Sequence, residues 1–469
     1  MPSMRTPRVI RILIVAAFVV ILNETTMNVA LSRIMEDFSI PERTAQWLTT
    51  AFMLTMAVVI PVTGWLLERL PTRAVFLLAM AIFCLGTLVC AIAPAFWLLL
   101  VGRVIQASGT AIMMPLLMTT IMQLVPEGER GAMMGNISLV IAMAPALGPT
   151  LSGVILSIGS WRLIFLIVLP IGLLTMWLGH RRLESVNEPT DTPLDWLSVL
   201  LTALGFGPLV YGLSIIGADV EFWLPPLCIG VGLGVLVAFT TRQLVLQGRG
   251  RAFLDLRTLT RKPFTVSLIM LSLAMMALFG TLIMLPLLLQ RAYGLSSLHV
   301  GLMLLTGGLA MGLLAPTIGR AFDRWGPRPL VIPASFAVLG VFLFLAGMSL
   351  STPWWAVMCA HIVLSLGFAA LFTPLITVAL GSLPRNLYSH GSAVVGASQQ
   401  VSGAAGTALF VTVFAMQTAA AESLVSTHAE AMLGGSHWAF LGAGAVWTGA
   451  TICGFFVSRT DAESVPAVE

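Results

Sequence analysis

GWLLERLPTR, residues 64–73, recurs further along the chain as GRAFDRWGPR, residues 319–328. The matching positions are all 255 residues apart, as is a proline that precedes each copy: Gly64 and Gly319, Glu68 and Asp323, Arg69 and Arg324, Arg73 and Arg328, Pro61 and Pro316. A match at one fixed separation, without a gap, indicates an internal duplication. The sequence therefore predicts two related halves.

The segments around the two copies are too apolar for a water-soluble protein. Hydrophobic residues make up 58% of the chain and charged residues only 9%, whereas about a quarter of a globular protein is charged. Continuous apolar runs of about 20 residues cross the roughly 30 Å hydrocarbon layer as helices. Fourteen such spans are predicted: residues 9–32, 46–67, 74–93, 97–122, 132–157, 162–180, 195–217, 222–241, 264–289, 298–319, 329–350, 354–380, 392–416 and 437–458.

The duplication divides these spans into groups. If the second and tenth spans are equivalent, each half has six helices, and two extra helices, residues 195–241, lie between the halves. We predict an all-α membrane protein with a 6+2+6 plan: a first six-helix bundle in residues 1–185, two inserted helices in 186–245, and a second bundle in 246–469. Two pseudo-symmetric bundles around a central cavity are a recurring transporter arrangement.

The basic residues predict the orientation. Placing the N-terminus in the cytoplasm assigns nineteen of the 24 lysines and arginines to that side, in agreement with the positive-inside rule. We therefore expect an integral protein of the plasma (inner) membrane with both termini cytoplasmic. The net charge of +4 reflects this topology, and no basic-aromatic pattern indicates a nucleic-acid partner.

Motifs for other kinds of chemistry are missing from the sequence. It contains no phosphate-binding GxxxxGK[ST] loop, no His or Cys metal cluster and no GxSxG nucleophile elbow in a soluble domain. These patterns would be expected in an ATP-driven pump, a metal-dependent protein or a hydrolase. We expect no enzyme activity, no metal and no cofactor.

An acid interrupts the first apolar run, LNETTMNVAL at residues 22–31, where Glu24 lies. Inserting a charged carboxylate there costs about 3 kcal/mol, so Glu24 is either neutral or faces a cation or water. Arg103 is the one cation predicted fully within a span. Gln106 and Thr110 follow Arg103 at helical spacing, and Asn28 lies one turn after Glu24. We therefore predict that Glu24 and Arg103 form either a permanent structural pair or a pair in which the proton occupancy of Glu24 changes.

Several segments together carry a family resemblance: LNETTMNVALSRI (22–34), QWLTTAFML (46–54), the two loop copies, GRVIQASGTAIMMP (102–115), APALGPTLSG (144–153), WRLIFLIVLPIG (161–172) and LPLLLQRAYGLS (285–296). On these segments the chain resembles the major facilitator superfamily, specifically its fourteen-span drug:proton antiporters. The resemblance implies alternating access, with small hydrophobic or amphipathic compounds, including lipophilic cations, exported in exchange for protons. It also implies that Glu24 is the proton-coupling acid, paired with Arg103, although the family often has an aspartate one residue earlier, at Asn23.

The resemblance also implies roles for the two loop copies and for APALGPTLSG. The loop residues Gly64, Glu68, Arg69, Arg73, Gly319, Asp323, Arg324 and Arg328 would gate one side of the transporter; alternatively their charges only set the topology. Pro145, Gly148, Pro149 and Gly153 would form a hinge between the halves. Small residues and prolines in membrane helices are also ordinary packing devices, so close helix contact is the alternative.

Polar and adaptable apolar side chains are the candidates for a substrate cavity. Methionine and aromatic residues suit a loose pocket for hydrophobic ligands. The candidates are Asn28, Gln106, Thr110, Met113, Asn136, Phe372 and Gln399. The expected partners are a small hydrophobic molecule, protons and the lipid bilayer, and the protein is expected to be monomeric. An exporter of lipids or of one endogenous metabolite is the alternative function, and a membrane enzyme or scaffold a third.

Overall fold

The computed structural model describes residues 8–187, 189–191, 193–216, 220–422 and 427–458. Over these residues the protein is helical and has no strand. The helices are α1 (Arg8–Phe38), α2 (Glu42–Ala45), α3 (Trp47–Arg69), α4 (Thr72–Ile92), α5 (Phe96–Leu124), α6 (Arg130–Ile158), α7 (Arg162–Arg182), α8 (Trp196–Ser214), α9 (Leu224–Gln247), α10 (Lys262–Arg291), α11 (Ser297–Trp325), α12 (Arg328–Ala346), α13 (Trp354–Gly381), α14 (Tyr388–Glu422) and α15 (His428–Gly454).

Twelve helical segments of the described residues are long and apolar enough to cross a membrane. The predicted count of fourteen spans is therefore not confirmed. The two long helices outside the twelve are α6 and α15. Both lie where spans were predicted, and both are rich in glycine and alanine. Small residues of this kind let membrane helices pack closely against each other.

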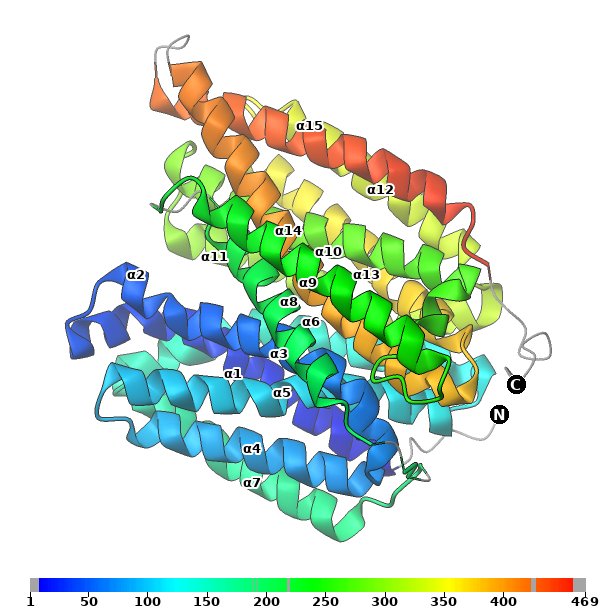
Figure 1. Ribbon diagram of the computed structural model, residues 1–469. Coiled ribbons are helices and arrows are strands. Elements are labelled where there is room, and N and C mark those ends of the chain that lie inside the picture. The colour runs from blue at the N-terminus through cyan, green and yellow to red at the C-terminus, as the bar shows by residue number, and fades with distance from the viewer. Residues whose placement is uncertain (1–7, 188, 192, 217–219, 423–426, 459–469) are drawn as a thin grey trace.

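Two groups of helices pack side by side (Figure 1). In the first, α1 contacts α5, α6 and α7, while α4 contacts α5 and α7 and α3 contacts α5. In the second, α10 contacts α13 and α14, α11 contacts α13, and α15 contacts α12 and α14. Below, the first group (α1 and α3–α7) is called the first half and the second group (α10–α15) the second half. In Figure 1, α1 begins and α15 ends at the same end of the molecule.

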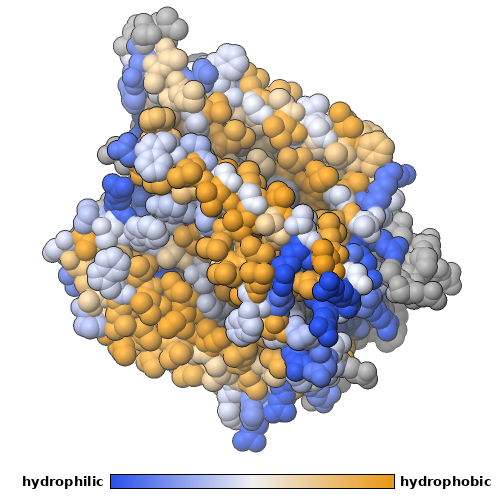
Figure 2. Space-filling model, in the orientation of Figure 1, coloured by the Kyte–Doolittle hydropathy of each residue, from blue (hydrophilic) through white to orange (hydrophobic). Residues whose placement is uncertain are grey.

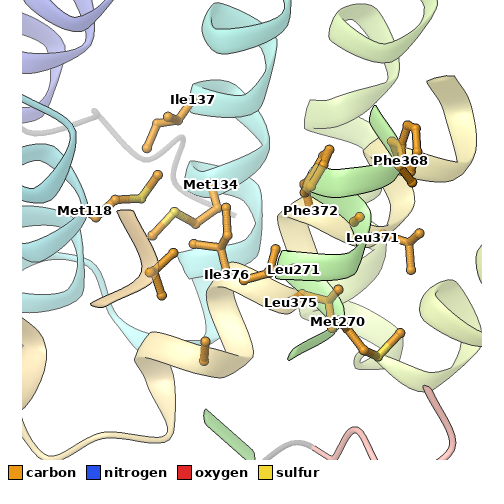
Figure 3. Packing of buried hydrophobic residues seen from close by; sticks show 14 of the residues in the cluster. Met118, Met134, Ile137, Met270, Leu271, Phe368, Leu371, Phe372, Leu375 and Ile376 are labelled. Carbon is orange, nitrogen blue, oxygen red and sulfur yellow. The ribbon is translucent and has the colours of Figure 1, made fainter. Parts of the chain in front are cut away.

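The two halves meet along two seams. One seam joins α6 to α11, and the other joins α3 to α14. A buried hydrophobic cluster is shared between the halves: Figure 3 shows Met118, Met134 and Ile137 of α5 and α6 on one side and Phe372 and Ile376 of α13 on the other. Continuous apolar contact of this kind buries both halves without directional bonds.

Two glycines allow the α6–α11 seam to be tight. A Cβ atom on Gly319 of α11 would lie 2.1 Å from the carbonyl oxygen of Gly131 on α6. A Cβ on Gly131 would lie 2.5 Å from the carbonyl oxygen of Gly319. Any side chain larger than hydrogen would force these two helices apart, so the glycine of the second loop copy brings the halves together.

The outer surface suits a bilayer. In Figure 2, apolar residues cover most of the visible face, and hydrophilic residues gather toward the end of the molecule where α1 begins. Large apolar side chains such as Trp97, Ile158 and Trp196 are more than two thirds exposed, at 71%, 74% and 74%. Trp97 and Trp196 lie in the first turns of α5 and α8, the positions that tryptophan favours at the membrane interface.

Candidate functional site

A buried polar network surrounds Arg103 in the first half. Arg103 lies on α5 and is only 1% exposed. Its Nη1 donates a hydrogen bond of 2.6 Å to Oε1 of Gln106, and its guanidinium lies 4.1 Å from the centre of the Phe52 ring on α3. Gln106 Nε2 donates to Oγ1 of Thr87 at 2.8 Å, and Thr110 donates to the carbonyl oxygen of Gln106. The helical spacing predicted this polar stripe.

Glu24 lies on α1, half-buried, and interacts electrostatically with Arg103. No direct ion pair or hydrogen bond holds the Glu24 carboxyl within the described part of the chain. Nε of Arg103 and both polar atoms of the Asn23 amide are buried without a hydrogen-bond partner in the structure. Opposite charges in a low-dielectric interior attract strongly even when they do not touch. The pair is therefore coupled, but Glu24 is not locked to Arg103.

The other predicted cavity residues lie in varied surroundings. Met113 is fully buried in the main hydrophobic cluster, and Phe372 is packed there too, with its ring stacked on Phe368 at 5.7 Å. Asn136 is exposed on α6, and Gln399 is half-buried on α14. The side chain of Asn28 lies outside the described residues.

Each loop copy bonds to the opposite half, near the end of the molecule where α3 and α11 end. We call this the loop end. Asp323 on α11 accepts hydrogen bonds from the backbone N–H groups of Gly131 and Ala132, at 2.8 and 2.7 Å. These groups belong to the first turn of α6. An anion is favourable there, since the first N–H groups of a helix have no partner within it.

Glu68 on α3 makes the corresponding contact with the first turn of α14. Its Oε1 accepts from Oγ of Ser389 at 2.9 Å and lies 2.9 Å from Nε2 of His390. A Cβ on Gly64 would lie 3.1 Å from Nδ1 of His390, so Gly64 makes room for the imidazole. Each acid therefore contacts the first turn of a helix in the opposite half, Asp323 through backbone N–H groups and Glu68 through side chains.

The arginines of the loop copies have different partners. Arg69 forms an ion pair with Asp191 and donates to the carbonyl oxygen of Thr190, and Arg73 lies 3.5 Å from His180. In the second half, Arg328 donates from Nε to the carbonyl oxygen of Val457 at 3.0 Å, and Arg324 lies over the Trp325 ring. The contacts of Arg69, Arg73 and Arg328 each join the end of a helix to another segment, whereas that of Arg324 stays within α11.

Further bonds between the halves were not predicted from the sequence. Thr119 on α5 and Ser392 on α14 lie 2.8 Å apart between hydroxyl oxygens, and Ser138 on α6 lies 2.9 Å from Thr373 on α13. Arg130 donates to the hydroxyl of Tyr388 at 3.4 Å. In Figure 1 the ribbons of the two halves diverge toward the end opposite the loop end. Together, these bonds describe a conformation in which the halves are joined at the loop end.

At the other end, Asp37 connects helices of the first half. Its Oδ2 accepts hydrogen bonds from Nη1 of Arg162 at 2.7 Å and from Nε1 of Trp161 at 3.0 Å. The hydrogen bond from Arg162 is the main cause of a lowered pKa for the Asp37 carboxyl, and the bond from Trp161 adds to it. Arg162 also donates to the carbonyl oxygen of Ala93. The contact fixes α1 and α7 to each other without reaching the second half.

The predicted hinge segment lies against α1. A Cβ on Gly148 would lie 2.2 Å from Oγ1 of Thr25, and Thr25 donates to the carbonyl oxygen of Ala144 at 3.3 Å. Gly153, by contrast, faces open space. The side chains of Pro145 and Pro149 lie outside the described residues. Gly148 thus allows α6 to approach α1 closely, next to Glu24.

Comparisons with known proteins agree with this architecture. Residues 13–407 match the family described as the Major Facilitator Superfamily. The chain is 39% identical over 459 residues to an uncharacterized MFS-type transporter, YcnB, of Bacillus subtilis strain 168, covering 96% of this chain and 94% of the relative. It is 37% identical over 404 residues to the lincomycin resistance protein LmrB of a Listeria monocytogenes strain, covering 85% and 84%. The solved structure of the human organic anion transporter MFSD10 has the same fold, with a TM-score of 0.67 and 16% identity over 97% of this chain and all of that one.

Proposed function

Because the chain belongs to the major facilitator superfamily of transporters, we propose that it exports small hydrophobic or amphipathic compounds in exchange for protons. Relatives at 36–37% identity are named lincomycin resistance proteins, which supports drug efflux. We propose a monomer in the plasma (inner) membrane with the loop end and both termini in the cytoplasm. Lincomycin and lipophilic cations are the substrates to test first.

The observation that carries the proposal is the pair formed by Glu24 and Arg103. Arg103 is permanently charged and held in place by Gln106 and Phe52, whereas Glu24 interacts with it without a direct bond. Such an acid can take up a proton from one side of the membrane and release it to the other when the cavity changes access. The membrane potential then adds about 2.3 kcal/mol per proton per 100 mV.

The bonds at the loop end supply the second requirement, a barrier that opens and closes. Glu68 and Asp323 each bond the first turn of a helix in the opposite half, and separating the halves there breaks both contacts. We propose that they stabilise the state closed to the cytoplasm and open to the outside. The hinge proposed around Gly148 would let α6 move against α1 and alter the surroundings of Glu24.

A reconstituted system tests the proposal. Purified protein in liposomes with an imposed pH gradient is challenged with lincomycin, with ethidium as a lipophilic cation, or with a labelled phospholipid, while a trapped dye reports luminal pH. We expect drug-dependent proton movement and substrate uptake against its gradient. Transport of the labelled lipid alone would instead identify a lipid exporter.

Glu24→Gln is the decisive variant. It removes the titratable group and keeps the shape of the side chain. We therefore expect the rate of proton-coupled transport to fall at least about a hundredfold. Glu36→Gln is the matched control, because Glu36 lies on the same helix and its side chain is 68% exposed. Unchanged proton coupling in Glu24→Gln would refute the assignment.

A further inference from the structure

The helix α8 lies on the seam between the halves. It contacts α3 of the first half and α14 of the second half, and α9 covers its other side. In Figure 1, α8 and α9 run across the face on which the two halves meet. Neither loop copy lies in this helix pair, and neither Glu24 nor Arg103 does. The pair nevertheless covers the seam between α3 and α14.

Side chains of α8 fill the seam. Val210 of α8 forms one buried cluster with Ala57 of α3 and Ala404 of α14, and Phe206 and Leu213 pack against that cluster. Nearer the start of α3, the rings of Trp47 and Tyr211 stack with centroids 5.6 Å apart and planes inclined by 22°. Because alanines from both halves face α8, its larger side chains occupy the space that lipid chains would fill.

Phe206 is shared between two clusters. It also packs against a second cluster, which α3, α5 and α14 build together from Phe52, Met56, Ile60, Ala107, Ala111 and Ala397. Phe52 is the ring that lies 4.1 Å below the guanidinium of Arg103. Phe206 is only half-buried. The cluster on which Phe206 packs therefore also contains the ring that lies against Arg103.

We propose that α8 forms the wall of the transport cavity at the α3–α14 seam and that Phe206 contacts the hydrophobic part of the substrate. This inference rests on the proposed export function and names a residue that would hold the aromatic part of the cations proposed there. The ring of a planar aromatic cation such as ethidium would stack on Phe206. Because the alanines of the cluster are small, Phe206, Phe52 and Met56 determine the size and flatness of the surface that a substrate would contact.

The test compares an aromatic with a non-aromatic substrate. Ethidium binding is measured by its fluorescence with the purified protein, and ethidium and lincomycin export are measured in liposomes. Losing one aromatic contact weakens binding by roughly threefold to tenfold, so Phe206→Ala should raise the ethidium dissociation constant by that factor and change lincomycin export less. Phe206→Leu keeps an apolar side chain but loses the ring, and should show the same selectivity if Phe206→Ala folds poorly. Phe206→Trp should restore ethidium binding.

Leu204→Ala provides the matched control, because Leu204 lies on the same helix and is 49% exposed. Equal losses for ethidium and lincomycin, or an equal effect of Leu204→Ala, would show that α8 acts by packing alone and would overturn the proposal. The absence of ethidium binding to the unaltered protein would also overturn it. Ethidium binding that depends on Phe206, without any export, would instead refute the proposed export function and leave this inference standing.

Discussion

At the scale of single residues, Asp37 should make the stability of the fold depend on pH. Hydrogen bonds from Arg162 and Trp161 lower the pKa of its carboxyl below the ordinary value of 3.8. A depressed pKa stabilises the fold fully above the unfolded value and loses that contribution as the pH falls through the folded value. The contribution should be about 0.5 kcal/mol, because the Asp37 side chain is 45% exposed and solvent screens the pair.

Asp37→Asn should therefore lower the thermal stability of the detergent-solubilised protein slightly at pH 6. It should also remove the part of the stability loss below pH 3.8 that comes from protonation of Asp37. Unfolding is followed by scanning fluorimetry between pH 2.5 and 6. Glu36→Gln, next to Asp37 and 68% exposed, should leave the pH profile unchanged. A steeper acid decrease in Asp37→Asn than in the unaltered protein would contradict this account.

Single residues also show how far a sequence predicts a site. The neighbourhood of Glu24 and Arg103 could be expected, because a charge in an apolar helix needs a partner or water and the chain offers one cation. The directions of Met113, Asn136 and Phe372 could not. Apart from short polar stripes, helices such as α5 and α13 are apolar around their circumference, so periodicity does not say which apolar side chains face a cavity and which pack in the core.

At the level of helices, replacing one carboxylate oxygen of Asp323 by an amide nitrogen should weaken its contact with α6. Asp323 accepts two hydrogen bonds at the start of α6, and an asparagine has only one acceptor oxygen and no charge. Asp323→Asn should destabilise the closed loop end by about 1–2 kcal/mol, which shifts the population of the two states about tenfold. We expect turnover to fall several-fold while the substrate dissociation constant changes less than twofold.

Transport rates and equilibrium binding, measured on the same preparation, separate the two effects. Asp191→Asn is the control, since Asp191 is 94% exposed and pairs with Arg69 outside the contact between the halves. Parallel losses of binding and turnover in Asp323→Asn would mean that Asp323 supports the substrate site and not the equilibrium between states.

The duplicated sequence did not predict which helices the two loop copies contact. Glu68 and Asp323 occupy matching positions in the sequence, but the segments they contact, PEGERGA at 126–132 and PRNLYSH at 384–390, share only their first proline. Asp323 bonds to backbone N–H groups, which every residue except proline has. A contact to the backbone does not depend on the partner's side chain, so Asp323 could be predicted from the sequence and its partner could not.

For the whole molecule, the bonds between the halves predict that transport requires them to separate at the loop end. Thr119 and Ser392 are the best pair for a test, because their hydroxyl oxygens lie 2.8 Å apart on α5 and α14, one helix in each half. Replacing both by cysteine places two thiols within disulfide range. Oxidation should then abolish transport, and reduction should restore it.

A second pair controls for the chemistry of cross-linking itself. Ser272 and Ser398 have hydroxyl oxygens 2.6 Å apart on α10 and α14, both within the second half, so their disulfide should leave transport nearly unchanged. Each pair is made after the five native cysteines are replaced, and each single cysteine variant is assayed beside it. If the Thr119–Ser392 disulfide forms fully and transport continues, the halves do not part at this level. The alternating-access mechanism would then need its moving parts elsewhere in the two bundles.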